Sequence, residues 1–370
     1  MDFFQRYVSN TSAGSGNQFF FTGTTEFLTG RIFYQVNIGG QFAYSFLFSN
    51  ILDSTFADGS VSHKNLICDT WEIGRMSAGA CEPDFFAAGL ENVDMERICG
   101  MTPVTFDGAK EKIVTPGTFF ATDPVLLDVE AGGFICLEIA FRGKMIPYHE
   151  ESIIPAYRKT AAGWTLCKQM PYAGMVGCSR PAACRIGFLG DSITQGIGTE
   201  MNSYTHWNAR LANQLGAQYA FWNLGLGYGR ANDAASDGAW LFKAKQNNVA
   251  VVCFGVNDIL QGFSAEEIKR DLTGIVDKLQ AAGVKVVLQT VPPFDYAGGQ
   301  RETWLAVNAY ILQVLEKKAD LVFDVVPVLR ESGEAPERAK YGGHPNAAGC
   351  RAWADALLPP LKAFLEKNFK

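Results

Sequence analysis

A serine stands just after a short apolar run near the middle of the chain. The run, residues 186–189, is too short for a helix and is followed by Gly190 and Asp191, which predicts a buried strand ending at a turn. Ser192 then lies at the carboxyl end of that strand, the edge of an α/β sheet where ligands bind. A hydroxyl at this edge is a candidate nucleophile for acyl transfer. The alternative is that Ser192 only caps a following helix.

Acyl transfer also needs a base that takes the serine proton and donors that bind the oxyanion. His344 is the candidate base, because it stands in a glycine-flanked loop before a predicted helix. Asn257, in segment 255–258 after another apolar run, carries an amide that can donate to an oxyanion. A glycine-rich segment, 223–227, follows a further apolar run. The other histidines of the chain are His63, His149 and His206.

These segments resemble the four short blocks of the SGNH (GDSL-like) hydrolases, a family of esterases. In that family the blocks carry a serine, a glycine, an asparagine and a histidine, in that order. Here they are residues 190–194, 223–227, 255–258 and 343–346, and the resemblance extends from Arg185 to the end of the chain. Gly-Asp-Ser alone occurs by chance in many proteins, whereas four blocks in the family's order make a strong signal.

The resemblance implies the composition of an oxyanion hole. Its donors are the backbone N–H of Ser192, a backbone N–H in segment 225–229 and the side-chain amide of Asn257. Family members often carry a glycine five residues after the asparagine of the second block, and this chain has Tyr228 there. We therefore assign the backbone donor of this segment provisionally to Gly227.

The resemblance also makes Ser192 the nucleophile and His344 the base, with Asp191 as a structural residue that orders the turn. Many family members place an aspartate three residues before the histidine, and this chain has Tyr341 there. Either a backbone carbonyl orients the imidazole, giving a Ser-His dyad, or another acid folds in. We favour the dyad. The candidate acids are Glu334, Glu337 and Asp324.

Apolar runs alternate with helix-length segments through the C-terminal half, which predicts a parallel sheet in an α/β domain. The clearest helix begins at a capping box formed by Ser264 and Glu267 and ends near Gly283, and the last helix begins after Pro345-Asn346. The resemblance implies a three-layer SGNH hydrolase domain with a flavodoxin-like sheet. The apolar runs are residues 186–189, 219–224, 249–254, 284–291 and 321–326.

Alternating apolar residues and glycine turns predict strands in the N-terminal half. Residues 31–38 and 42–48 predict a hairpin with a two-residue turn at Gly39-Gly40, and residues 134–141 predict a further strand. Because this half shows hardly any helical periodicity, we predict an all-β sandwich or jelly roll. We interpret most of its aromatic residues as core, notably Phe42, Phe46 and Phe48.

Segments between residues 104 and 143 resemble the β-sandwich domain that precedes the catalytic domain in some SGNH carbohydrate esterases. We therefore predict an accessory sandwich domain over residues 1–180 and a catalytic hydrolase domain over residues 181–370. The stretch before Pro181 is rich in Gly, Ala, Pro and Ser, which is typical of a linker.

The composition excludes several classes of partner. A net charge of −6 offers no basic surface for nucleic acid, and no apolar run has the length of a membrane span. Nine cysteines without metal-site spacing indicate reduced, mostly buried thiols, and we expect neither a metal nor another cofactor. The first residues do not have the pattern of a secretory signal, so we expect a cytoplasmic protein. The sequence is compatible with an oligomer.

The function that the resemblance implies is a serine esterase that removes O-acetyl groups from oligosaccharides, such as mannan or xylan fragments, through an acetyl-serine intermediate. Trp207, Trp304 and Tyr228 are candidate contacts to the sugar. One alternative is a lipolytic esterase or thioesterase of the same superfamily. Another is a catalytically inactive glycan-binding protein, which the joint presence of serine, asparagine and histidine disfavours.

Overall fold

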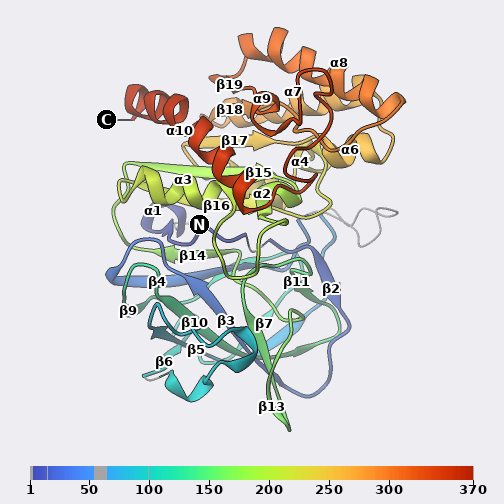
Figure 1. Cartoon of the computed structure of the whole chain (residues 1–370). Helices are drawn as coiled ribbons and strands as arrows, with labels where there is room; N and C mark the ends of the chain where they lie inside the picture. The colour runs from blue at the N-terminus through green and yellow to red at the C-terminus, as the bar shows by residue number, and fades with distance from the viewer. Residues whose placement is uncertain (1–2, 15, 54–64, 99, 370) are drawn as a thin grey trace. The chain divides into compact units, whose positions relative to one another are not determined.

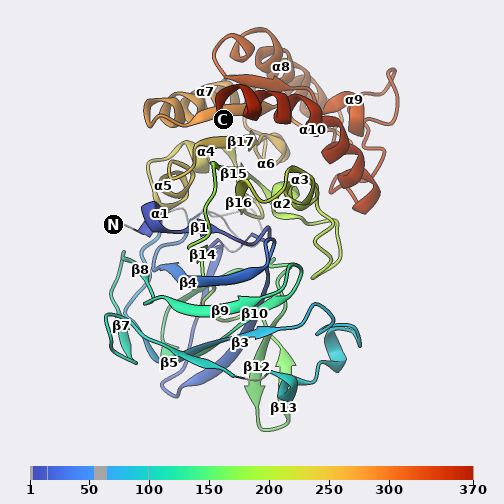
Figure 2. The ribbon, with the colours of Figure 1, turned by 90° about the vertical axis from the view of Figure 1, so that its left-hand side faces the viewer.

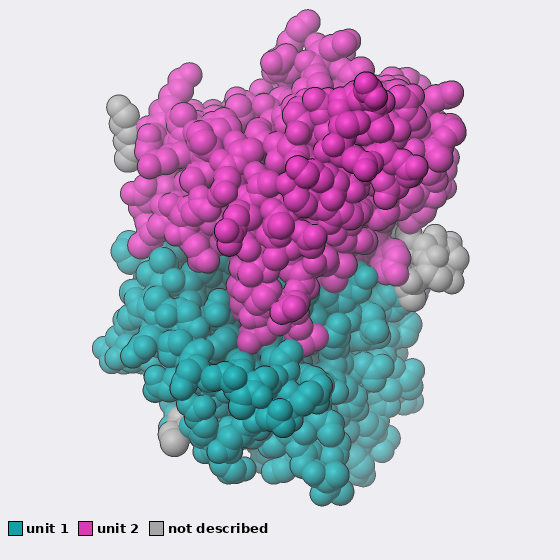
Figure 3. All heavy atoms as spheres, in the orientation of Figure 1, with its two compact units in different colours: residues 1–53, 65–181 teal, residues 54–64, 182–370 magenta. Residues whose placement is uncertain are grey.

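The structure is a computed structural model that describes residues 3–14, 16–53, 65–98 and 100–369. The chain divides into two compact units, which Figure 3 shows in different colours. Among the described residues, the first unit ends at Pro181 and the second begins at Ala182. Each unit buries its own apolar core.

The described part of the first unit consists mainly of two antiparallel sheets (Figure 1). The first sheet has the order β1-β14-β4-β8, with β9 also paired to β4. Its strands are Val8–Ser9 (β1), Gly40–Ser49 (β4), Phe119–Ala121 (β8), Val125–Val129 (β9) and Met175–Cys178 (β14).

The second sheet has the order β13-β12-β3-β10-β5-β6, with β7 also paired to β5. A separate pair is formed by β2 and β11. The strands of the second sheet are Leu28–Gln35 (β3), Trp71–Cys81 (β5), Thr102–Val104 (β6), Lys112–Val114 (β7), Phe134–Gly143 (β10), Ala156–Thr160 (β12) and Gly163–Leu166 (β13). The remaining elements of the unit are Phe3–Arg6 (α1), Phe19–Phe21 (β2), Leu90–Asn92 (η1), Met95–Arg97 (η2) and Ile146–Tyr148 (β11).

Aromatic side chains from the two sheets meet in the core of this unit. Trp71 of β5 lies edge-on against Phe120 of β8, with ring centroids 6.1 Å apart, and Phe120 stacks on Phe48 of β4 at 5.2 Å. Phe46 and Phe48 are buried, which confirms their interpretation as core residues, whereas Phe42 is only half-buried. The contact between sheets is the packing expected of a β-sandwich.

The predicted hairpin at Gly39-Gly40 is wrong. Strand β3 pairs with β10 and β12 in one sheet, whereas β4 pairs with β14, β8 and β9 in the other. The consecutive residues Ile32, Phe33 and Tyr34 are all fully buried, so β3 is a central strand covered on both faces. The glycines therefore lead the chain from one sheet to the other. The strand predicted at 134–141 is confirmed as β10.

The second unit contains a sheet of parallel strands in the order β16-β15-β17-β18-β19 among the described residues (Figure 1). Figure 2 labels three of these strands, β15, β16 and β17. All five predicted apolar runs coincide with these strands. Their bounds are Cys184–Gly190 (β15), Tyr219–Gly225 (β16), Val249–Cys253 (β17), Lys285–Gln289 (β18) and Leu321–Phe323 (β19).

Helices connect these strands, and two predicted helix starts are confirmed. Ser264 caps α7 and forms the capping box with Glu267, and Asn346 caps α10. The helices are Ser192–Gln195 (α2), Trp207–Leu215 (α3), Ala231–Ala235 (α4), Ala239–Ala244 (α5), Val256–Leu260 (α6), Ala265–Ala281 (α7), Gly299–Gln313 (α8), Leu315–Lys317 (η3), Val326–Leu329 (α9) and Ala347–Asn368 (α10).

Stacked indole rings hold α3 against α10. Trp207 and Trp353 are fully buried, and their rings are nearly parallel with centroids 4.8 Å apart. Within the described residues, no helix combines the length and the apolar character needed to cross a membrane. The eight cysteines of this part are free thiols, and all except Cys167 are buried.

Candidate active site

Three parallel strands end side by side at the edge where the predicted blocks lie. Gly190 at the end of β15 is in register with Gly225 of β16 and with Cys253 of β17. Because the carboxyl ends of adjacent parallel strands share one edge, the segments that follow them are neighbours. The serine, glycine and asparagine blocks are therefore brought to the same edge of the sheet.

The serine and histidine blocks are in direct contact. The Oγ of Ser192 lies 2.7 Å from Nε2 of His344, within hydrogen-bond distance, although the two residues are 152 positions apart in the chain. Ser192 is 7% exposed. The ring of Phe294 packs edge-on against the His344 imidazole, with centroids 5.4 Å apart. This is the nucleophile and base arrangement that acyl transfer requires.

A tight turn places Ser192 at the first position of α2. The Asp191 carboxylate accepts a hydrogen bond from the backbone N–H of Ile193 at 3.0 Å and so caps this short helix. A side chain at Gly190 would collide with Thr194 Oγ1 and with the carbonyl of Cys253. The glycine and the aspartate before the serine are thus explained by close packing and by capping.

The turn after Ser192 also holds the segment that follows β16. Gln195 is fully buried, and its Oε1 accepts a hydrogen bond from the backbone N–H of Gly227 at 2.7 Å. Asn223 Nδ2 donates to the Gln195 carbonyl at 3.3 Å. A side chain at Gly225 would collide with the backbone of Gln195. Sequence reasoning did not identify Gln195, and the available signal was its position directly after the first block.

The geometry changes one assignment in the predicted oxyanion hole. Because the N–H of Gly227 is donated to Gln195, it is not available to an oxyanion in this conformation. The next residue, Tyr228, has a φ of 58°, the left-handed conformation that glycine adopts most easily. Tyr228 therefore keeps the backbone conformation of a glycine at the position where family members often have one.

The amide of Asn257 lies at the start of α6 and is directed to the glycine-rich segment. Its Nδ2 donates to the carbonyl of Gly229 at 2.9 Å, and an amide nitrogen has a second hydrogen to donate. Asn257 is half-buried. At Gly255, just before α6, φ is 125° and an added Cβ would collide with the side chain of Val291. The third block is thus joined to segment 225–229, which overlaps the second block.

In the described part of the chain, none of the acids considered as a third triad member contacts His344. Asp324 accepts from Thr290 Oγ1 and Glu337 pairs with Arg301, whereas Glu334 is exposed. Within the same residues, neither a carboxylate nor a backbone carbonyl accepts a hydrogen bond from the His344 ring. Burial alone lowers the pKa of His344 below its usual 6.5. The imidazole is therefore neutral at pH 7, as a general base must be.

Two buried carboxyl groups adjoin catalytic residues in the sequence, one just before Ser192 and one just after Asn257. Asp191 and Asp258 are 2% and 0% exposed. Burial raises the pKa of each to about 7, and the charge of Asp258 adds to the effect on Asp191. Asp258 accepts a hydrogen bond from the backbone N–H of Ala231 at 3.0 Å, which ties α6 to α4. Asp191 therefore supports the turn at α2 and Asp258 supports the start of α4, and among the described contacts neither carboxyl group bonds to the Ser192 hydroxyl.

The remaining residues singled out from the sequence lie in the core or outside the described part. Trp207 and Trp304 are buried, and Trp304 Nε1 donates to the carbonyl of Val291 at 2.9 Å, so neither is a sugar contact. His149 and His206 are also fully buried. His63 lies outside the described residues. A cluster of three or more possible metal ligands does not occur among the residues that the structure describes.

Comparisons with known proteins agree with the class of enzyme that this geometry indicates. Residues 188–352 match the model of the GDSL-like Lipase/Acylhydrolase family. Most of the second unit is thus similar to the GDSL-like lipases and acylhydrolases. A search of curated proteins finds no match.

Several solved structures are similar to about half of this chain. A putative lipolytic protein of the G-D-S-L family from Desulfitobacterium hafniense is 20% identical with a TM-score of 0.40, covering 47% of this chain and 97% of its own. A carbohydrate esterase family 3 protein from Talaromyces cellulolyticus is 19% identical with a TM-score of 0.38, covering 50% and 98%. A structure described as TesA is 25% identical with a TM-score of 0.40, covering 49% and 99%.

Replacement of Gln195 tests whether it positions the oxyanion segment. Gln195→Met removes the acceptor for the Gly227 N–H, whereas Gln195→Glu keeps an oxygen there. We expect the methionine variant to lower kcat on p-nitrophenyl acetate roughly tenfold to a hundredfold with little change in KM, because donors displaced by a fraction of an ångström stabilise the transition state less. The glutamate variant should retain more of the rate. Equal kcat in wild type and the methionine variant, both folded by circular dichroism, would contradict this role.

Asp258→Asn tests the buried carboxyl group. The pKa of Asp258 is about 7 in the folded protein and 3.8 in its reference state, so the folded protein keeps a proton that the unfolded chain releases. Its contribution to stability is therefore fully present below about pH 4 and is lost as the pH rises through 7. We expect the free energy of unfolding of the variant, relative to wild type, to increase between pH 4 and pH 8 in urea titrations. A pH-independent difference, matching that of the surface variant Asp355→Asn, would count against the raised pKa.

Proposed function

We propose that this protein is a serine esterase that removes O-acetyl groups from oligosaccharides, such as mannan or xylan fragments, through an acetyl-serine intermediate. The observation that carries the hydrolytic part is the 2.7 Å contact between Ser192 Oγ and His344 Nε2 at the carboxyl edge of the parallel sheet. A serine that only capped a helix would not need an imidazole nitrogen on its hydroxyl. The same contact disfavours an inactive glycan-binding protein.

The proposed reaction uses the groups that the strand ends bring together. Neutral His344 accepts the proton of Ser192 as Oγ attacks the acetyl carbonyl carbon, and the resulting imidazolium protonates the departing sugar hydroxyl. Water then attacks the acetyl-serine with His344 again as base, which releases acetate and restores the serine. The metal-free donor set of serine, histidine and asparagine is sufficient for each of these steps.

We assign the oxyanion hole to three donors. They are the backbone N–H of Ser192 at the start of α2, the free hydrogen of the Asn257 amide, and a backbone N–H of segment 225–229. Within that segment we assign the donor to the backbone N–H of Tyr228 and no longer to that of Gly227, because the Gly227 N–H donates to Gln195. A neutral amide donates to the transient charge without binding the product acetate as a cation would.

The saccharide part of the proposal rests on the resemblance to two-domain carbohydrate esterases. In this interpretation residues 1–180 are the accessory β-sandwich of the jelly-roll type, and residues 181–370 are the catalytic domain with a three-layer SGNH architecture. The two antiparallel sheets of the first unit and the parallel sheet of the second support that division.

Asn257→Ala tests the oxyanion hole. We expect kcat on p-nitrophenyl acetate to fall by roughly a hundredfold or more, about 3 kcal/mol of transition-state stabilisation, because the amide is a donor to the developing charge. The variant should remain folded, since it loses one hydrogen bond to the carbonyl of Gly229. An unchanged rate in the folded variant would remove Asn257 from the catalytic machinery. Ser192→Ala is the inactive reference.

A substrate panel tests the proposed specificity. Acetylated manno-, xylo- and chito-oligosaccharides are incubated with the protein, and the loss of acetyl groups is followed by mass spectrometry beside p-nitrophenyl acetate and octanoate. We expect loss of acetate from one glycan class, little cleavage of the octanoate and no reaction with Ser192→Ala. Cleavage of the octanoate with the glycans untouched would support a lipolytic enzyme instead. Inactivity on every substrate would favour a glycan-binding protein.

A further inference from the structure

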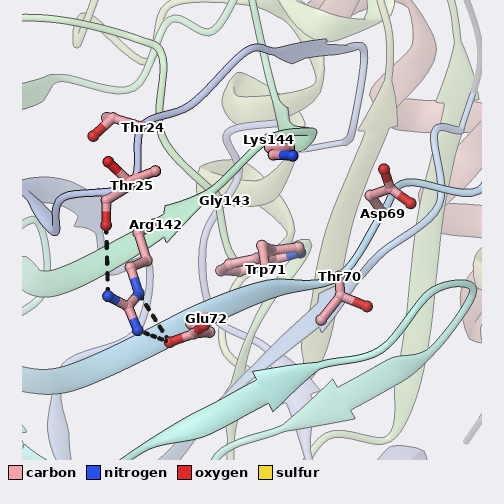
Figure 4. A pocket seen from close by; sticks show the side chains of 9 residues that line it. All are labelled: Thr24, Thr25, Asp69, Thr70, Trp71, Glu72, Arg142, Gly143 and Lys144. Atoms are coloured by element: carbon pink, nitrogen blue, oxygen red, sulfur yellow. Dashed lines mark hydrogen bonds and ion pairs between the residues drawn. The ribbon is translucent and has the colours of Figure 1, made fainter.

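The first unit contains a pocket of about 440 Å³, and the catalytic residues are not among those that line it. Its lining comes from three segments, residues 24–25, 69–72 and 142–144, all of them in the first unit. Figure 4 shows their side chains arranged around Trp71. The volume is within the range of pockets that bind small molecules.

The floor of the pocket is held rigidly. Trp71 is 1% exposed, and its Nε1 donates to Asn50 Oδ1 at 2.9 Å. Gly143 of β10 is in register with Trp71 of β5, and a Cβ at Gly143 would lie 2.5 Å from the Trp71 Cβ. The two strands approach each other closely here because position 143 has no side chain. The indole is therefore a fixed support and is too buried to stack on a ligand.

An ion pair fixes one wall of the pocket. Arg142 and Glu72 are cross-strand partners, and the guanidinium donates twice to Glu72 Oε2, at 2.6 and 2.9 Å (Figure 4). The guanidinium also lies over the ring of Phe27, 4.5 Å from its centroid. Arg142 is thus oriented and largely neutralised before any ligand binds.

Other polar groups at the pocket have no partner within the described part of the chain. They are the ammonium of Lys144, the carboxylate of Asp69, the hydroxyls of Thr25 and Thr70, and Glu72 Oε1, and no hydrogen bond or ion pair joins any of them to a described residue. Lys144, Asp69 and Thr70 are exposed. Side chains of both charge signs therefore line the same cavity.

This mixture of groups points to a ligand with many hydroxyls and no net charge. The two basic and two acidic side chains of the lining balance each other, so a free anion gains little from Lys144 while meeting Asp69 and Glu72. A sugar hydroxyl can both accept from an ammonium and donate to a carboxylate, and charged partners make these hydrogen bonds stronger. We propose that the pocket binds a short uncharged saccharide. This binding is a function of the first unit and does not require turnover at Ser192.

The test measures saccharide binding in the full chain without hydrolysis. Manno- and xylo-oligosaccharides without acetyl groups, and N-acetylated chito-oligosaccharides, all of them uncharged, are titrated into the Ser192→Ala variant by isothermal calorimetry, and sodium sulfate serves as an anionic probe. We expect one neutral oligosaccharide class to bind and sulfate not to bind. Binding of sulfate alone, or of no saccharide at all, would overturn the proposal.

Two substitutions locate the binding at this pocket. Lys144→Ala and Asp69→Asn, each in the Ser192→Ala background, should weaken the oligosaccharide affinity about tenfold or more, since each loses a charge-assisted hydrogen bond. Lys110→Ala, an exposed lysine of the same unit outside the pocket, is the matched control and should leave affinity unchanged. Equal affinity in all variants would place the saccharide elsewhere and refute the assignment.

The same substitutions in the active protein separate this proposal from the proposed function. Lys144→Ala with Ser192 intact should hydrolyse p-nitrophenyl acetate at the wild-type rate, because none of the catalytic residues lines the pocket. If the wild-type protein has no esterase activity, the proposed function is refuted, whereas the calorimetric titrations still test the saccharide pocket. Loss of that activity in the Lys144→Ala variant alone would contradict a separate binding site.

Discussion

The close approach of the α2 turn to the segment after β16 is the constraint on which the active site depends. Gly225 has no room for a side chain because the backbone of Gln195 lies against it, and the Gln195 amide then holds the Gly227 N–H at 2.7 Å. These contacts fix the nucleophile and the glycine-rich segment relative to each other. The α6 amide of Asn257 joins the same segment through the carbonyl of Gly229. Three elements from separate parts of the sequence thus behave as one rigid frame.

The imidazole depends on this frame in a different way. His344 comes from the loop before α10 and contacts the frame through the Ser192 hydroxyl, with Phe294 packed against its ring. No described carboxylate assists it, so burial governs its protonation and keeps it neutral. A carboxylate would stabilise the imidazolium more strongly, and a base without one relies more on the oxyanion donors. The buried acids Asp191 and Asp258 do not orient the His344 imidazole, since neither has a described contact with it.

Local patterns in the sequence predicted the second unit better than the first. Each parallel strand is a short apolar run after a helix-length segment, and Ser264 with Glu267 marks a helix start by its own side chains. Gly39-Gly40 carries the same local signal whether the chain reverses within a sheet or crosses to another one. Only the pairing of β3 with β10 decides between these outcomes, and that partner is about 100 residues further along the chain, with Leu137 opposite Ile32. Similarly, the hydrogen bond from the Gly227 N–H to Gln195 joins residues that are 32 positions apart, so a local pattern does not reveal it.

The first sheet of the first unit joins the two ends of that unit. Val8 of β1 is opposite Cys178 of β14, which lies between β1 and β4. During synthesis the ribosome must therefore complete nearly the whole unit before this sheet can close, and closing so long a loop slows folding. Until then β4 has an open edge, which is a site for pairing with other chains. Truncation after the middle of the first unit would thus yield an aggregation-prone fragment rather than a smaller stable domain.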